Sequence, residues 1–328
     1  MKKIIELSNI TSIPEFYNGM ILVYSSNVLL FISEKTGKIV HKISFDNWYP
    51  LEVSDGKVLM YRNDLFIYDD ELKNFVVYHN SIGGGLVAFF DDKIIEDKYD
   101  RESKSVQVTL YKKNSNGQLW QNIFPNRVGS CIWGNNLYVT DLSFKYIDFI
   151  DAESGEVRNT LHFENPPISR FIYYYEDTLI VSLQIRPLEE YILLGLDAMT
   201  GEEKWRLKSA NNLYIQDSRS GYLYDIGGKQ FNIIDPNEGK VLYKGNMSDE
   251  NKKFNVCPEC GILGENGIYF KDNFPHSRIG LINIQTHKIE FVIDLNLPKG
   301  VKVTEMSYHN GRLYVQDTND TLHIFAEE

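Results

Sequence analysis

The amino-acid sequence predicts an all-β fold, a single closed β-propeller of four-stranded antiparallel blades that fills residues 1–328. Two turn patterns that repeat along the chain and an abundance of Tyr and Phe, which favour strands, predict this fold. We expect eight blades, or seven if the third and weakest unit is absorbed elsewhere.

The first repeated pattern is clearest in GLDAMTGEEKW, residues 195–205. Six further segments share it: SEKTGKIVH, DDELKNFVVY, KNSNGQLWQ, DAESGEVRN, DPNEGKVLY and NIQTHKIEF. One aligned column reads Gly37, Asn74, Gly117, Gly155, Gly201, Gly239 and His287. Glycine adopts a positive φ without penalty, and Asn and His are among the few other residues enriched there. Four places earlier, six of the seven residues are Ser, Asp or Asn, which start turns. Each segment is therefore expected to be a hairpin turn.

The second pattern is a tight polar turn that precedes an apolar strand. It occurs in NGMILVY, DGKVLMY, DDKIIED, GNNLYVT, EDTLIVS, SGYLYDI, NGIYFKD and NGRLYVQ, whose turn residues are spaced 36 to 46 apart. Combined with the first pattern, each unit contains four short strands, which is the signature of a propeller blade. The eighth unit ends one strand short, and KKIIEL at the N-terminus is a spare strand. We expect this strand to pair with the C-terminal blade and close the ring.

Within LDAMTGEEKW, the pattern Asp-Ala-x-Thr-Gly-x-x-x-Trp resembles the repeat of PQQ-like, quinoprotein-type propellers, in which the Trp docks on the neighbouring blade. Eight blades are also typical of that family. The resemblance extends along the whole chain as periodicity, but the strict motif occurs only in this unit. The Trp column reads His41, Tyr78, Gln121, Asn159, Trp205, Tyr243 and Phe291, with Trp120 one place early.

The resemblance implies one of two functions: dehydrogenation with a quinone and a metal ion in the central channel, or non-enzymatic scaffolding. The enzymes of this kind typically carry a disulfide between adjacent cysteines, whereas Cys131, Cys257 and Cys260 include no adjacent pair. No catalytic residue of the family maps to a position in this sequence. We therefore expect a non-enzymatic member without a cofactor.

Charge and composition restrict the partner and the location. The formal net charge is −11 and the isoelectric point is near 5.2, which disfavours nucleic acid and favours a basic partner. Glu6, Ser8 and Asn9 interrupt the apolar start, and no apolar run is long enough to cross a membrane. A cytoplasmic protein without membrane attachment is expected, and its oligomeric state is left open.

The most provocative local motif is CPECG, in which Cys257 and Cys260 have the spacing of a zinc knuckle. A closed zinc site needs four ligands and no second cysteine pair exists, so an ordinary loop is the favoured interpretation over a metal or redox site. The sequence contains no Gly-x-Ser-x-Gly, His-Glu-x-x-His or calcium-loop pattern, and no catalytic residue is predicted.

Loop length predicts a binding face. Units 3, 4, 5 and 7 have longer segments between their second and third strands, namely DKYDRESKS, TDLSFKY, QIRPLEE and KDNFPHSR. These loops share a face with the connections between blades. Aromatic residues and arginines, which are the usual anchors of protein interfaces, are expected on that face: Trp48, Tyr49, Arg127, Trp133, Arg170, Arg186 and Arg278. Alternatively, Tyr49 and Trp133 pack between blades and each arginine pairs with a carboxylate.

The function expected from the sequence is a non-enzymatic scaffold that recognises a protein or peptide on the long-loop face, in one version as an immunity- or inhibitor-type protein. The alternative is an enzyme or sensor that binds a small molecule, sugar or quinone in the channel.

Overall fold

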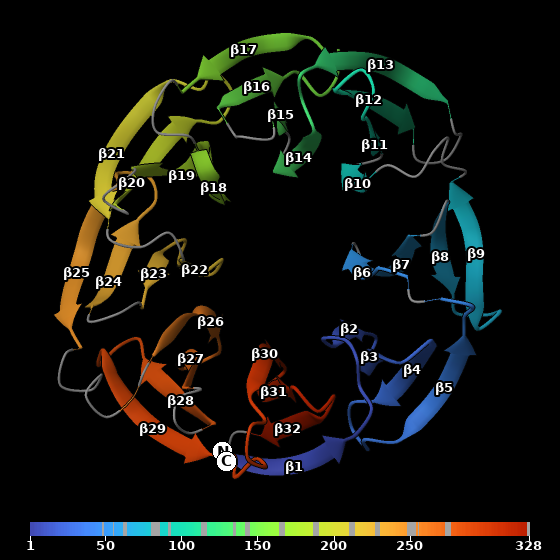
Figure 1. Cartoon of the computed structure of the whole chain (residues 1–328), viewed down its shortest axis with the longest axis vertical. Coiled ribbons are helices and arrows are strands. Elements are labelled where there is room, and N and C mark those ends of the chain that lie inside the picture. The colour runs from blue at the N-terminus through green and yellow to red at the C-terminus, as the bar shows by residue number, and fades with distance from the viewer. Residues whose placement is uncertain are drawn as a thin grey trace.

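The computed structural model contains eight four-stranded antiparallel sheets arranged as blades around a central axis (Figure 1). The described residues are 1–47, 49–54, 56–61, 64–79, 86–90, 93–112, 117–133, 136–141, 145–163, 168–185, 190–209, 214–226, 230–247, 254, 256–272 and 277–326. The prediction of eight blades is confirmed, and the third unit forms a blade of its own.

Blades are numbered in chain order, and the strands of each blade from the innermost outwards. Blade 1 contains β2 (Glu15–Tyr17), β3 (Met20–Ser25), β4 (Val28–Ser33) and β5 (Ile39–Ser44); blade 2 contains β6 (Leu51–Ser54), β7 (Lys57–Tyr61), β8 (Leu65–Asp69) and β9 (Asn74–His79). Blade 3 contains β10 (Leu86–Phe90), β11 (Lys93–Asp100), β12 (Ser105–Lys112) and β13 (Gln118–Pro125); blade 4 contains β14 (Gly129–Trp133), β15 (Asn136–Thr140), β16 (Tyr146–Ile150) and β17 (Val157–His162).

The second half of the ring repeats this arrangement. Blade 5 contains β18 (Ile168–Tyr175), β19 (Thr178–Ile185), β20 (Glu190–Asp197) and β21 (Glu203–Ser209); blade 6 contains β22 (Ile215–Gln216), β23 (Leu223–Asp225), β24 (Gln230–Asp235) and β25 (Lys240–Asn246). Blade 7 contains β26 (Cys257–Leu263), β27 (Gly267–Asp272), β28 (Arg278–Asn283) and β29 (Lys288–Asp294); blade 8 contains β30 (Val303–His309), β31 (Arg312–Asp317), β32 (Leu322–Ala326) and β1 (Lys2–Leu7).

The ring closes as the sequence predicts. The N-terminal strand β1 pairs with β32 from Lys2 opposite Ala326 to Leu7 opposite Leu322. The buried His323 in β32 reinforces this pairing, because its Nε2 lies 2.9 Å from Asp317 Oδ2 and its Nδ1 lies 3.5 Å from Glu6 Oε2.

The core lies between the blades, and period-two alternation sends the side chains of each inner strand to both neighbours. In β15, Leu137 and Val139 pack against blade 3, whereas Tyr138 packs against blade 5. Since both faces of such a strand are buried, its sequence is continuously apolar. Among the described residues, no helix is long and apolar enough to span a membrane.

The predicted hairpin turns form through one hydrogen-bond pattern. Asp197 Oδ1 accepts the backbone N–H groups of Met199 and Thr200 at 3.0 and 2.8 Å, and the Gly201 N–H donates to the Asp197 carbonyl at 2.8 Å. Gly201 has φ 74°, as the pattern requires. In unit 2 the alignment was wrong by one residue: Asp69 starts the turn and Lys73, at φ 51°, takes the left-handed position expected for Asn74.

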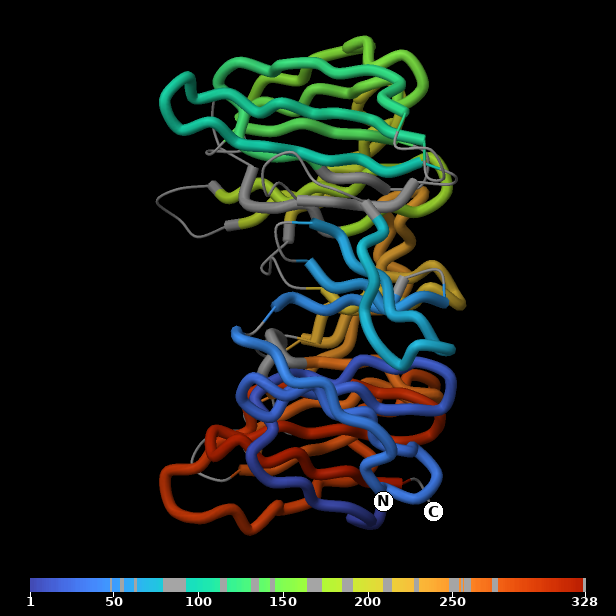
Figure 2. The backbone as a smooth tube through the Cα atoms, turned by 90° about the vertical axis from the view of Figure 1, so that its right-hand side faces the viewer, coloured from blue at the N-terminus to red at the C-terminus, as the bar shows by residue number. Residues whose placement is uncertain are grey.

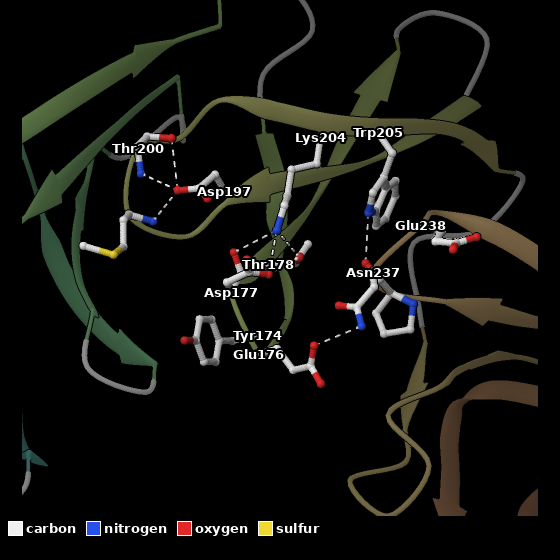
Figure 3. Close-up of polar contacts among 12 residues, drawn as sticks. Tyr174, Glu176, Asp177, Thr178, Asp197, Thr200, Lys204, Trp205, Asn237 and Glu238 are labelled. Carbon is white, nitrogen blue, oxygen red and sulfur yellow. Dashed lines mark hydrogen bonds and ion pairs between the residues drawn. The ribbon is translucent and has the colours of Figure 1, made fainter.

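Residues of the Trp column dock blades on their neighbours, most fully at Trp205. Trp205 is 9% exposed and its Nε1 donates to the Pro236 carbonyl in the turn of blade 6 at 2.9 Å (Figure 3). A Cβ atom on Gly239 would lie 2.4 Å from this ring, so the turn and the indole are in direct contact.

Trp120 makes the same contact in blade 4, where it donates to the Ala152 carbonyl at 3.0 Å and covers Gly155. The assignment of Gln121 to the Trp column is therefore wrong, and Trp120 belongs there. Trp120 pairs with Leu110 at the edge of a β-bulge, just as Trp205 pairs with Gly195. The Lys112 N–H donates to the Gly117 carbonyl as the Asp151 N–H donates to Glu156 in blade 4, so the alignment of unit 3 was wrong by one residue; its turn residues 113–116 lie outside the described residues.

One of the predicted long loops is largely strand, and a second is strand at both of its ends. The segment DKYDRESKS of blade 3 continues β11 and β12 to eight residues each, joined by a turn of residues 101–104. Asp100 Oδ1 accepts the Glu102 N–H at 3.0 Å and Lys104 takes φ 50°, so this turn uses the same device as the other hairpins. In blade 5, β19 and β20 are likewise eight residues long and include parts of QIRPLEE.

Replacing Trp205 by alanine should lower the free energy of unfolding by about 3–5 kcal/mol, because it removes a large buried wedge between two blades. Chemical denaturation measures this loss. The exposed Leu119→Ala on β13 is the control and should change stability by less than about 0.5 kcal/mol. A loss below about 1 kcal/mol for Trp205→Ala would contradict the wedge.

Gly239→Ala should destabilise the protein more than Gly19→Ala. Both glycines have positive φ (63° and 70°), which costs an alanine about 1 kcal/mol, but only at Gly239 does the new Cβ meet a ring. Denaturation of both single variants and of Gly239→Ala in the Trp205→Ala background measures the difference. Equal losses for Gly239→Ala and Gly19→Ala would show that the turn does not press on the indole.

Candidate functional site

The predicted binding residues fall into three groups in the structure. Trp48 and Arg186 lie outside the described residues. Trp133 ends β14 and Arg170 lies in β18, both on innermost strands, and their side chains are outside what the structure describes. Tyr49, Arg127 and Arg278 are described with their side chains.

Arg127 is held by a carboxylate of the next blade. Its Nε and Nη2 donate to the two oxygens of Asp148 in β16 at 2.6 and 3.1 Å, and both side chains are largely buried. The guanidinium also lies over the ring of Tyr146, 4.8 Å from its centroid, and Thr160 Oγ1 donates to the same Asp148 at 2.7 Å. A bidentate pair of this kind fixes the arginine in one orientation.

Arg278 and Tyr49 are anchored in similar ways. Arg278 forms an ion pair with the fully buried Asp272 and lies over Phe254, 5.0 Å from its centroid. The Tyr49 hydroxyl donates to Asp46 at 2.6 Å. Each described arginine of the predicted set thus pairs with a carboxylate, as the alternative interpretation expected, and their use as binding anchors stays a prediction.

Arg127 and Asp148 also line a cavity of about 430 Å³ on the outer wall of the ring, at the seam between blades 3 and 4. Its rim carries the exposed apolar side chains of Ile123 and Val157 and the carboxylate of Glu156. Because Asp148 neutralises the arginine, the cavity presents an apolar and acidic surface.

The Cys-x-x-Cys motif lies in a strand and not in the expected loop. Cys257 and Cys260 belong to β26, the innermost strand of blade 7. Cys257 pairs with Lys271 and Ile262 pairs with Tyr269, so β26 advances by five residues where β27 advances by two. The motif therefore lies in an irregularity of the strand pairing. Across the parts of the chain that the structure describes, no group of three His, Cys, Asp or Glu residues could hold a metal ion.

A pair of glutamates on the innermost strands was missed by the sequence analysis. Glu15 in β2 pairs with Leu22, and Glu52 in β6 pairs with Leu59, so the two occupy equivalent positions in blades 1 and 2. Burial and the charge of Glu52 raise the pKa of Glu15. Tyr61 donates to Glu52 Oε2 at 3.0 Å, and burial raises the pKa of that tyrosine. Aligning the inner strands of the repeats would have revealed this pair.

The comparisons with known proteins support the fold. No protein-family model matches the sequence, and no curated protein matches it significantly. Similar solved structures include dihydro-heme d1 dehydrogenase NirN in complex with DHE, with 11% identity and a TM-score of 0.62 over 94% of this chain and 72% of that chain. Saccharomyces cerevisiae Sqt1 has 9% identity and a TM-score of 0.62 over 99% of each chain. A europium-containing methanol dehydrogenase has 10% identity and a TM-score of 0.58 over 96% of this chain and 84% of that chain.

At these identities the likeness establishes the propeller fold alone. The methanol dehydrogenase among the similar structures agrees with the resemblance to quinoprotein-type propellers at the level of the fold. Dehydrogenases therefore share the fold with this chain, and the choice between catalysis and binding depends on the chain's own residues.

Glu15→Gln should stabilise the protein at pH 7 and have little effect near pH 3. The folded-state pKa of Glu15 lies above its ordinary value, so folding disfavours the ionised carboxylate. This penalty is absent below the unfolded pKa and develops fully as pH rises through the folded pKa. Denaturation at both pH values measures the difference. Equal effects of Glu15→Gln at the two pH values, or the same gain from the exposed turn residue Glu71→Gln, would contradict it.

Proposed function

We propose that this propeller is a non-enzymatic scaffold that recognises a protein or peptide. Its partner would bind the connection face, defined here by the links between blades and the turns between second and third strands. The observation that carries this proposal is the length of the inner hairpins in blades 3 and 5.

Strand length distinguishes these blades from their neighbour. The second and third strands are eight residues long in blades 3 and 5, but five residues long in blade 4 between them. Figure 2 shows the turn between β11 and β12, in teal, projecting on the left beyond the blue blades 1 and 2. A closed ring has no structural need for such extensions, which therefore support a role in binding.

The tip of the blade 3 hairpin carries two residues of types that often anchor interfaces. Residues 98–104 are exposed, and they include Tyr99 at 37% and Arg101 between acidic neighbours. Tyr and Arg are enriched among the residues that dominate binding energy. The net charge of −11 would accelerate association with a basic partner and make that rate fall with salt. An immunity- or inhibitor-type protein that neutralises a basic domain is one form of this function.

The alternative function is an enzyme or sensor that binds a small molecule, sugar or quinone in the channel. Glu15 and Glu52, as neighbouring carboxylates on innermost strands, favour it as a place for a cationic group. The two larger cavities described here, however, lie at seams between blades and not among these residues.

A pull-down with matched variants tests the proposed function. We expect the wild-type protein to capture a polypeptide from a lysate of its source cells, and Tyr99→Ala/Arg101→Ala to lose it. These side chains are exposed, so the fold should be unaffected, whereas Arg127→Ala would break a buried ion pair. Leu72→Ala/Arg206→Ala, on the other face and the outer wall, is the control and should retain the partner.

The captured polypeptide should then bind in purified form, with an association rate that falls as salt rises. If the Tyr99→Ala/Arg101→Ala variant captures the polypeptide as well as the wild type does, the partner does not bind at the connection face. Empty captures for all three proteins would remove the support for a scaffold.

A further inference from the structure

The outermost strand of blade 3 differs from the outermost strands of the other blades. β13 is eight residues long, whereas the other seven have six or seven residues. Six of those seven contain lysine, arginine, aspartate or glutamate. The β13 sequence QLWQNIFP contains none, and β9, the other exception, is two residues shorter. Charged side chains keep an edge strand from pairing with another strand, and β13 lacks this protection.

The solvent-facing side of β13 is mainly apolar. Leu119 and Ile123 are 50% and 62% exposed, and Gln121 between them is exposed as well. Trp120 and Phe124 point the other way and pack against blade 4. Figure 1 shows β13 at the outside of the ring. The strand therefore presents two apolar side chains and one amide on the outer rim.

The outer edge of β13 has the geometry to extend its sheet. β13 is the last strand in the order β10-β11-β12-β13. The Asn126 N–H donates to the Lys104 carbonyl at 2.7 Å, which fixes which residues bond to β12. Because bonded and non-bonded pairs alternate in an antiparallel ladder, Gln121 and Ile123 direct their backbone N–H and C=O groups away from β12. Pro125 has no N–H and ends this edge.

The cavity of about 430 Å³ at the seam between blades 3 and 4 borders the same edge. Residues 122–125 of β13 line one side, and Val157, which is 48% exposed, lies on the other. The Arg127–Asp148 ion pair in the lining is neutral as a unit, and the carboxylate of Glu156 is exposed to solvent. A strand added to β13 would therefore bring an apolar side chain to Ile123 and Val157.

The sequence of β13 is complementary to itself. In an antiparallel pair of two copies centred on Gln121, Leu119 of each copy lies opposite Ile123 of the other. The two Gln121 amides then meet at the twofold axis. A shift by two residues in either direction would place Gln121 opposite Leu119 or Ile123 instead.

Charge restricts where two copies of this chain can meet. Each copy carries a net charge of −11, so two copies repel one another over most of their surface. Like charges directly opposite each other also destabilise a strand pair. A symmetric pair places similar residues face to face, and the uncharged β13 satisfies this condition over its full length.

We propose that a second copy of this chain pairs with the outer edge of β13 and joins the two blades 3 into one eight-stranded antiparallel sheet. The contact is isologous, so each copy contributes the same strand. Leu119 of one copy would enter the cavity beside Ile123 and Val157 of the other. The site uses the outer rim and neither Tyr99 nor Arg101, so this inference stands independently of the proposed function.

Charge exchange at the twofold axis tests the pairing. The purified full chain should sediment as a dimer that dissociates on dilution. Gln121→Lys and Gln121→Glu should each be monomeric at a concentration at which the wild type is dimeric, because each places like charges opposite each other. An equimolar mixture of these two variants should restore the dimer, since lysine of one copy then faces glutamate of the other.

Two further variants locate the contact. Ile123→Lys should also give a monomer, while its far-ultraviolet circular dichroism remains native because the side chain is exposed. Val40→Lys, at a position of β5 that is 58% exposed, is the control and should remain dimeric.

Three results in sedimentation would overturn the proposal: a monomeric wild type, a dimer that persists in both Gln121 variants, or a mixture of these variants that stays monomeric. A monomeric wild type that captures a different protein from a lysate, with capture lost in Ile123→Lys, would assign the edge to that protein. This result would also overturn the pairing of two copies.

Discussion

The contact between an outer side chain and the neighbouring turn is the constraint on which the rest of the ring depends. Trp205 shows it most fully: the indole N–H donates to the Pro236 carbonyl, and its ring leaves no space for a Cβ on Gly239. Glycine is therefore required at position 239 for two reasons: the backbone has a φ of 63°, and the indole ring leaves no room for a side chain. Repetition of this contact sets the spacing and angle between blades, and the buried inner strands then fill the core between them.

The fold was predictable because its signals are local. A turn-forming residue four places before a left-handed residue is visible in a single sequence. Seven such turns, eight tight turns before apolar strands and a spare N-terminal strand together define a closed ring. The predictions were wrong where strand pairing, and not local sequence, determines the position of a residue. The bulge that places Trp120 opposite Leu110 depends on strand pairing, and so does the continuation of β11 through Lys98, Tyr99 and Asp100. Exposed strand residues and loop residues have the same polar composition, so their sequence could not separate them.

The sequence indicated which residue types would form the candidate site, but it did not show which residues would pair with one another. The sequence identified Arg127 and Arg278 as arginines near blade connections, yet Asp148 lies 21 residues from its partner and in another blade. A buried arginine that pairs with a carboxylate contributes geometry to the fold, because removing either member leaves an uncompensated charge. The exposed side chains at the tip of the β11–β12 hairpin are not part of a buried ion pair. Residues of this kind can change without loss of the fold, and a recognition surface is more easily built from them.

Ring closure by non-consecutive strands is a second constraint on the fold. The ladder from Lys2–Ala326 to Leu7–Leu322, together with His323 between Asp317 and Glu6, holds blade 8 closed without a covalent turn. The closing strand also carries Ile5, which packs on Gly37 in the turn of blade 1, so blade 8 docks on its neighbour through the same kind of contact that Trp205 makes with Gly239.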